Sequence, residues 1–124
     1  MLSGDARLRY GQALASVAPG LGLGPEKVSK LRVKYARSPV VVIVWVAVDA
    51  DARRAAEDRD AVAAGVQNLL LGATSFGLGS YWASVPELLT DATRAFAGVG
   101  ADHDPVALVY LGWPTGPVSV PCLL

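Results

Sequence analysis

The sequence contains residue types able to do acid–base or metal chemistry, but none of them stands in a catalytic pattern. The single histidine, His103, lies between Asp102 and Asp104 directly before Pro105, a composition typical of a turn. A serine hydrolase would need a Gly-X-Ser-X-Gly nucleophile elbow, and the sequence has none. We therefore expect no catalytic side chain and no metal site, so any chemistry is expected to come from a bound organic cofactor.

The stretch Gly20–Pro25, GLGLGP, is a second candidate because its repeated glycines are similar to those of a phosphate-binding loop. A dinucleotide fingerprint must follow a strand and open a helix, and its glycines have a different spacing. Here the stretch follows a helix end and runs into proline. We interpret it as a connector.

The third candidate is a basic segment, residues 26–37, which holds five cations and one acid in the sequence EKVSKLRVKYAR. Val28, Leu31 and Tyr35 fall on one face of a helix at this spacing. The segment is therefore predicted to be helical, and its charged side is most simply a face exposed to solvent.

Length and charge narrow the class of protein. The 124 residues, 52% of them hydrophobic, are expected to form one domain over residues 1–124. The formal net charge is zero, which argues against nucleic acid as a partner, since such proteins carry a basic excess. The charge is unevenly distributed, because residues 1–37 carry seven basic and two acidic side chains and residues 38–124 carry four and nine.

Cysteine use and hydropathy indicate where the chain works. The single cysteine, Cys122, excludes a disulfide within the chain, so a reducing, cytoplasmic location is the default expectation. The longest apolar run, residues 40–48, has nine residues, whereas a membrane-spanning helix needs about 20. The first residues do not form a secretory signal. We expect no membrane partner.

Two long apolar segments must position any site. Residues 40–48 follow Ser38-Pro39 and are mostly β-branched without alternation, which predicts a central strand covered on both faces. A helix is predicted at about 52–76, charged in its first half and nearly all apolar in its second. A helix that is apolar on nearly every side must be buried all round, so we expect it to pack against a second subunit as well as its own sheet.

The other elements follow from apolar spacing and chain breakers. We expect a first helix capped by Ser3 or Asp5 and ending at Pro19-Gly20, a strand at 80–84, a helix at 86–97, a loop at 98–104, a strand at 105–112 and an extended tail at 115–124.

The order of these elements resembles the nitroreductase family of FMN-dependent oxidoreductases. The resemblance is strongest over residues 26–114 and rests on AAGVQNLLLGA at 63–73, FGLGSYW at 76–82 and VALVYLGWP at 106–114. It implies an α+β fold in which an incomplete sheet is flanked by helices, and a dimer with helix 52–76 at the interface. It also implies FMN bound between subunits, passing reducing equivalents, usually from NAD(P)H, to nitro, quinone or related small molecules.

The resemblance also assigns candidate cofactor-binding residues. The turn after Gly-Leu-Gly-Ser-x-Trp supplies backbone contacts near flavin N5 and O4 in the family, which falls on Ser84 and Val85 here. A basic side chain before the buried strand meets the flavin N1/O2 edge, and Lys30, Arg32 and Lys34 are the candidates. The alternative is that all five are ordinary surface residues.

Several features depart from the family. The Arg-x-Ser-x-Arg segment that grips the FMN phosphate and the Pro-Ser-x-x-Asn-x-Gln-Pro-Trp stretch over the ring are both missing. Nothing basic follows Arg94, where the family tends to place a cation, and Val85 replaces a glycine. The FMN phosphate therefore has no evident partner on this chain.

Two classes of function are consistent with these observations. In the first, the chain is a truncated subunit that completes a flavin pocket shared with a full-length nitroreductase-like paralogue, as in cyclic dipeptide oxidases or NAD(P)H-dependent nitro and quinone reductases. In the second, it is a non-catalytic interaction or structural module, or a fragment of a longer nitroreductase.

Overall fold

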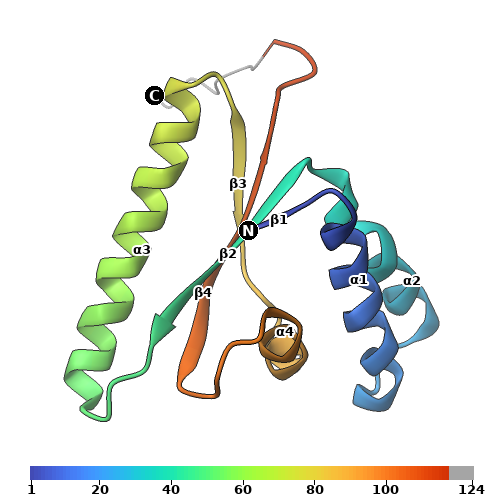
Figure 1. The fold of residues 1–124 in the computed structure, drawn as a ribbon, viewed down its shortest axis with the longest axis horizontal. Coiled ribbons are helices and arrows are strands. Elements are labelled where there is room, and N and C mark those ends of the chain that lie inside the picture. The colour runs from blue at the N-terminus through green and yellow to red at the C-terminus, as the bar shows by residue number, and fades with distance from the viewer. Residues whose placement is uncertain (118–124) are drawn as a thin grey trace, which may run out of the picture.

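The protein, described here by a computed structural model covering residues 1–117, is a three-layer α+β domain. A four-stranded antiparallel sheet has the order β1-β2-β4-β3, formed by β1 (Leu2–Ser3), β2 (Val40–Ala47), β3 (Gly79–Ala83) and β4 (His103–Gly112). Helices α1 (Asp5–Val17), α2 (Pro25–Lys34) and α4 (Thr90–Ala97) lie on one side, and α3 (Ala52–Ser75) lies on the other (Figure 1). The expected fold class, with its long apolar helix, is confirmed.

Three short 3₁₀ segments complete the secondary structure of the described residues: η1 (Ala18–Leu21), η2 (Tyr35–Arg37) and η3 (Glu87–Leu89). The first two extend α1 and α2, and the third leads into α4.

The two faces of the sheet explain the unbroken apolar run of β2. Val41 and Ile43 belong to the core cluster on the side of α1, together with Tyr10 and Leu14. The alternate residues of β2 pack instead into a second cluster centred on Val66 of α3. Because successive strand residues point to opposite faces and both faces are covered, every position of the strand is apolar.

The close approach of α1 and α2 depends on Gly11. A Cβ added at this position would lie 2.5 Å from the backbone oxygen of Leu31 and 3.0 Å from that of Arg32. Arg7 adds a second link from α1, since its guanidinium donates to the carbonyl oxygens of Ala36 and Ser38. These contacts hold α2 and the chain leading into β2 in place.

Three predicted element boundaries are wrong. The first helix has Gly4 at its N-cap and no side-chain cap, because Ser3 pairs with Val40 in β1 instead of capping. The helix predicted at 86–97 starts as η3 and becomes α-helical only at Thr90. The strand predicted at 105–112 begins earlier, since His103 pairs with Ala47.

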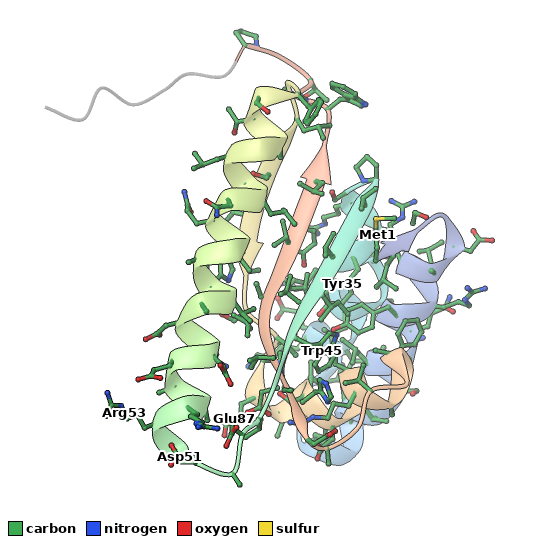
Figure 2. The ribbon with its side chains drawn as sticks, turned by 60° about the vertical axis from the view of Figure 1, so that its left-hand side comes forward. Met1, Tyr35, Trp45, Asp51, Arg53 and Glu87 are labelled. Carbon is green, nitrogen blue, oxygen red and sulfur yellow. The ribbon has the colours of Figure 1, made fainter. Side chains whose placement is uncertain are left out.

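Helix α3 ends as its sequence predicts. Gly77 follows the last turn with φ of 78°, a left-handed conformation that glycine adopts without steric cost. Asp51 caps the other end by accepting a hydrogen bond from the backbone N–H of Arg54 at 2.9 Å. Figure 2 shows Asp51 and Arg53 at this charged end of the helix. The expectations for the tail at 115–124, beyond residue 117, and for Cys122 lie outside the described residues.

Candidate functional site

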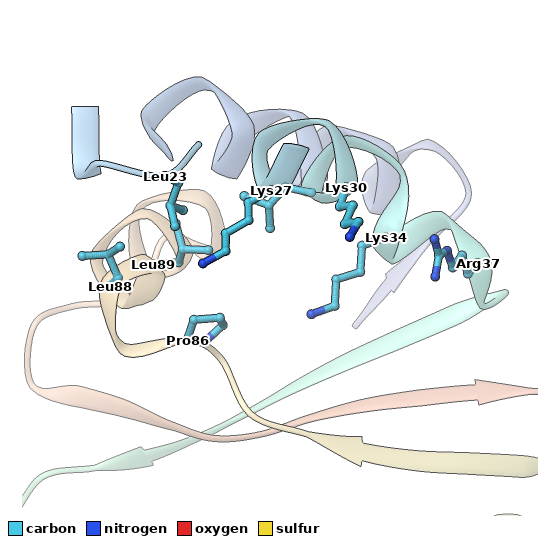
Figure 3. Close-up of a pocket in the computed structure, with 9 residues that line it drawn as sticks. Leu23, Lys27, Lys30, Lys34, Arg37, Pro86, Leu88 and Leu89 are labelled. Atoms are coloured by element: carbon cyan, nitrogen blue, oxygen red, sulfur yellow. The ribbon is translucent and has the colours of Figure 1, made fainter. Parts of the chain in front are cut away.

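A cavity of about 590 Å³ lies between α2 and the segment Pro86–Leu89 (Figure 3). Four of its nine lining residues are cations: Lys27, Lys30, Lys34 and Arg37. The other five are apolar: Leu23, Leu31, Pro86, Leu88 and Leu89. We call this cavity the basic groove. Its volume falls within the range of about 300–1,000 Å³ that small-molecule sites occupy.

Helix geometry explains why the lysines share one side of the groove. Lys27, Lys30 and Lys34 follow an i, i+3, i+7 spacing, which places them in a row on one face of α2. Arg37 continues this row from η2. Figure 3 shows the ammonium groups of Lys27 and Lys34 directed into the space above Pro86. Lys27 and Arg37 were not among the predicted site residues, although the same spacing could have identified Lys27.

Carboxylates do little to neutralise this row. The only ion pair from the groove lysines within the described residues joins Lys30 Nζ to Glu26 Oε1 at 2.7 Å, and both side chains are largely exposed. Exposed pairs of this kind contribute about 0.2–1 kcal/mol, so the pair holds Lys30 weakly. Among residues 1–117, no acidic side chain lines the groove. The groove therefore presents an excess of positive charge.

An aromatic cavity of about 400 Å³ adjoins the basic groove. The two share Lys34 and Arg37, and the second is completed by Ser38, Tyr81, Ala83 and Tyr110. Tyr81 and Tyr110 face each other across the pair β3–β4, with ring centroids 6.2 Å apart. Together the two cavities combine cationic, aliphatic and aromatic surface.

The aromatic cavity is backed by a cluster that contains all four tyrosines. Tyr35 stacks on Tyr110 with ring centroids 6.5 Å apart, and Tyr10 lies 4.5 Å from Tyr35. The hydroxyls of Tyr35 and Tyr110 are buried and find no hydrogen-bond partner among residues 1–117. Burial raises the pKa of Tyr35, and it raises the pKa of Tyr110 to about 12.

These shifts predict a loss of stability in alkali. A tyrosine whose folded pKa lies above its unfolded value of about 10 binds its proton more tightly in the folded state, so the free energy of unfolding falls as pH rises from about 10 to 12. In Tyr110→Phe this fall is expected to be shallower. Urea denaturation at pH 9, 10 and 11 measures it, and identical slopes in both proteins would contradict the assignment.

The three basic residues predicted to bind the cofactor do not all line the same cavity. Lys30 and Lys34 line the basic groove, whereas Arg32 lies on another side of α2 and lines a separate cavity with Pro19 and Pro25. The structure therefore brings together only two of the three basic candidates.

The other two candidates lie on the link between β3 and η3. Ser84 is exposed and lines none of the cavities described here, while Val85 is half-buried and lines a polar cavity with Arg94 and Asp104. Their neighbours Ala83 and Pro86 form the walls of the aromatic cavity and the basic groove. The Ser84-Val85 link therefore runs beside both cavities.

His103, the single histidine, lies against a neighbouring carboxylate. His103 Nδ1 is hydrogen-bonded to Asp102 Oδ1 at 2.9 Å, and this contact lowers the pKa of the Asp102 carboxyl. Within residues 1–117, no three His, Cys, Asp or Glu side chains gather where they could hold a metal ion. In the same range, none of the helices combines the length and the apolar character needed to cross a membrane.

The sequence matches one protein family, and the fold matches solved structures named for the same family. The sequence model of the nitroreductase family matches residues 5–113, which is most of the chain. The fold is similar to that of a nitroreductase-like family protein from Bacillus cereus, with a TM-score of 0.73, 22% sequence identity, and coverage of 96% of this chain and 65% of that one.

Two further solved structures share the fold. The FMN-dependent nitroreductase NfnB from Mycobacterium smegmatis, solved in complex with NADPH, has a TM-score of 0.65 at 19% identity, with 92% of this chain and 66% of that chain covered. A nitroreductase family protein from Clostridium novyi has a TM-score of 0.63 at 17% identity, with 86% and 56% covered. The chain thus spans 56–66% of the length of these three structures.

Proposed function

Because the chain belongs to the nitroreductase family, we propose that it is a subunit of an FMN-dependent oxidoreductase that completes a flavin pocket with a longer nitroreductase-like partner. The observation that carries the proposal is the juxtaposition of the α2 cations, the Ser84-Val85 link and the aromatic cavity on one side of the sheet.

The residues present are compatible with a flavin mononucleotide. Tyr81, Tyr110 and Ala83 offer a largely apolar, aromatic surface against which an aromatic ring can pack. The buried Tyr110 hydroxyl is without a hydrogen-bond partner in the described structure. Lys34 and Arg37 border the same cavity and supply positive charge. When bound, FMN would supply the redox step by passing reducing equivalents between a donor and an acceptor.

In this proposal the side chains of this chain bind and orient the cofactor. Of the three basic candidates, Lys34 is favoured for the N1/O2 edge because it lines both cavities and is half-buried beside Tyr35, with Nζ 5.5 Å from the ring centroid. A cation here stabilises negative charge gained by a ring on reduction. The backbone of Ser84 and Val85 lies beside the same space and is proposed to meet the opposite edge.

We propose that the partner docks on α3. Only Val66 and Ala73 of this helix are buried, whereas Leu71 is 60% exposed and Phe76, at its C-cap, is 78% exposed. Trp113, which is 70% exposed, lies close to Gly77, so apolar side chains gather at this end of the helix. Exposed apolar clusters mark interaction surfaces, and the partner would bury what the sheet leaves uncovered.

A visible absorption spectrum of the purified chain tests the proposal. We expect a colourless chain that binds FMN only when it is co-expressed with a longer nitroreductase-like protein, such as one encoded by an adjacent reading frame. Flavin bound at a 1:1 ratio to the chain alone would refute the need for a partner. A colourless protein in every combination would favour the alternative of a non-catalytic interaction module.

Substitution of Lys34 tests its role at the ring. In the flavin-loaded complex, Lys34→Gln is expected to make the flavin midpoint potential more negative, because it removes a cation that stabilises the reduced ring. Arg32→Gln removes the same charge from the same helix but points into a different cavity. A larger shift in Arg32→Gln than in Lys34→Gln would reverse the assignment.

A further inference from the structure

We propose that the basic groove is a phosphate-binding site of this chain, which takes the phosphate of a flavin mononucleotide or of a pyridine nucleotide. The inference rests on the proposed function for the kind of molecule bound. In this proposal Lys27 and Lys30 of α2, in the part of the groove beyond Lys34, bind the phosphate. This chain, and not the partner alone, then contributes side chains to the phosphate site.

The positive charge of the groove favours an anionic ligand. Four cations line it and no carboxylate of the described residues does, so its side chains repel one another unless an anion is present. Lys30 is paired only with the exposed Glu26 carboxylate, and no ion pair of Lys27 or Arg37 occurs among the described residues. An anionic ligand would relieve this repulsion, and the enclosing walls would strengthen the attraction.

The number and spacing of the α2 lysines indicate which kind of anion fits the groove. Lys27 and Lys34 lie seven residues apart on α2, a distance of about 10 Å along the helix axis. A single carboxylate carries one negative charge, so it would neutralise only one of these cations. A phosphate offers up to two charges on three oxygens, and lysine binds it as a point charge without the planar match that arginine requires.

The apolar wall selects what the phosphate is attached to. Leu23, Leu88 and Leu89 close one end of the groove, and the other end opens toward Tyr81 and Tyr110 through the shared Lys34 and Arg37. A free inorganic ion would leave this apolar and aromatic surface uncovered. A phosphate joined to a planar aromatic group would fill both cavities at once.

The test titrates the full chain, alone and in its flavin-binding complex, with FMN, riboflavin, NADPH and inorganic phosphate. Riboflavin is the matched probe because it has the ring of FMN without the phosphate. We expect FMN to bind at least about tenfold more tightly than riboflavin, and its advantage to shrink in 0.5 M salt, which screens exposed charges. NADPH tests whether the groove takes the phosphate of a pyridine nucleotide as well as that of FMN, because the two molecules compete only if both bind there.

The variant Lys27→Gln/Lys30→Gln tests the residues while leaving Lys34 in place. Each lysine is exposed, so the loss of one is expected to weaken FMN binding about 2- to 5-fold. The loss of both is expected to weaken FMN binding about tenfold and to leave riboflavin binding unchanged. The control Arg9→Gln removes an exposed cation of α1, away from the groove and from α3, and should change the affinity for neither ligand. Circular dichroism verifies that each variant is folded.

The outcomes separate this proposal from the function on which it rests. Equal affinity for FMN and riboflavin, or an unchanged FMN affinity in the double lysine variant, would overturn the phosphate site and leave the flavin function standing. Lysine-dependent binding of NADPH or phosphate by a chain that never binds flavin would support the site and refute the flavin function. Failure of every phosphate-bearing probe to bind either preparation would also overturn the site.

Discussion

Gly11→Ala is expected to lower the free energy of unfolding by about 2 kcal/mol, because its new methyl group would meet the α2 backbone. The added Cβ would lie 2.5 Å from the Leu31 carbonyl oxygen, and neither helix backbone can move without disturbing the core. Overpacking costs about 1–3 kcal/mol and occasionally more, while the higher helix propensity of alanine returns at most about 1 kcal/mol. Urea denaturation followed by circular dichroism measures the net change.

Gly65→Ala provides the matched control. Gly65 also lies in the interior of a helix, but no heavy atom lies within 4 Å of a Cβ built there. The same substitution is therefore expected to raise the free energy of unfolding by about 0.5–1 kcal/mol. Equal effects of the two substitutions would show that helix propensity, and not the contact between α1 and α2, decides stability at Gly11.

The pair Leu71→Asp/Phe76→Asp is expected to abolish assembly with the partner proposed above. Burial of each side chain in an interface contributes about 1.5–3 kcal/mol, and a buried unpaired carboxylate adds a desolvation cost. The binding free energy lost in the double variant corresponds to an affinity for the partner that is at least about a hundredfold weaker. Size-exclusion chromatography of the co-expressed pair measures it, and the flavin absorbance should be lost from the eluted chain.

The control for this surface is Leu71→Met, which keeps an apolar side chain of similar size and should retain assembly. Because Leu71 and Phe76 are exposed in the single chain, the aspartate variant should unfold at nearly the same urea concentration as the unmodified protein. Normal assembly of the aspartate variant would place the partner on another surface.

The two longest apolar segments of the chain form the elements that their patterns predict. The apolar run at 40–48 and the helix at 52–76 were predicted nearly to the residue, because each is long and has an apolar pattern that only one kind of element satisfies. The start of β4 at His103 was missed, because Asp-His-Asp is turn-like by composition. Its pairing with Ala47 in the sheet overrides that local preference.

The candidate site was less predictable. The sequence pointed to Lys30, Arg32 and Lys34 as equivalent neighbours, and only the placement of α2 separates Arg32 from the other two. Tyr81 and Tyr110 come together from strands 29 residues apart in the chain through the pairing of β3 with β4. No local pattern encodes that distance.

The sequence by itself therefore determined the class of fold, the family and the uneven distribution of charge, with seven basic side chains before Ser38. These are properties of composition and short-range spacing. The tertiary structure decided that four of those cations face a cavity into which residues 1–117 place no carboxylate, and that an aromatic cavity adjoins it. Packing of α2 against α1 at Gly11, and of the sheet against both helical layers, sets these relations, because contacts distant in sequence have no local signature.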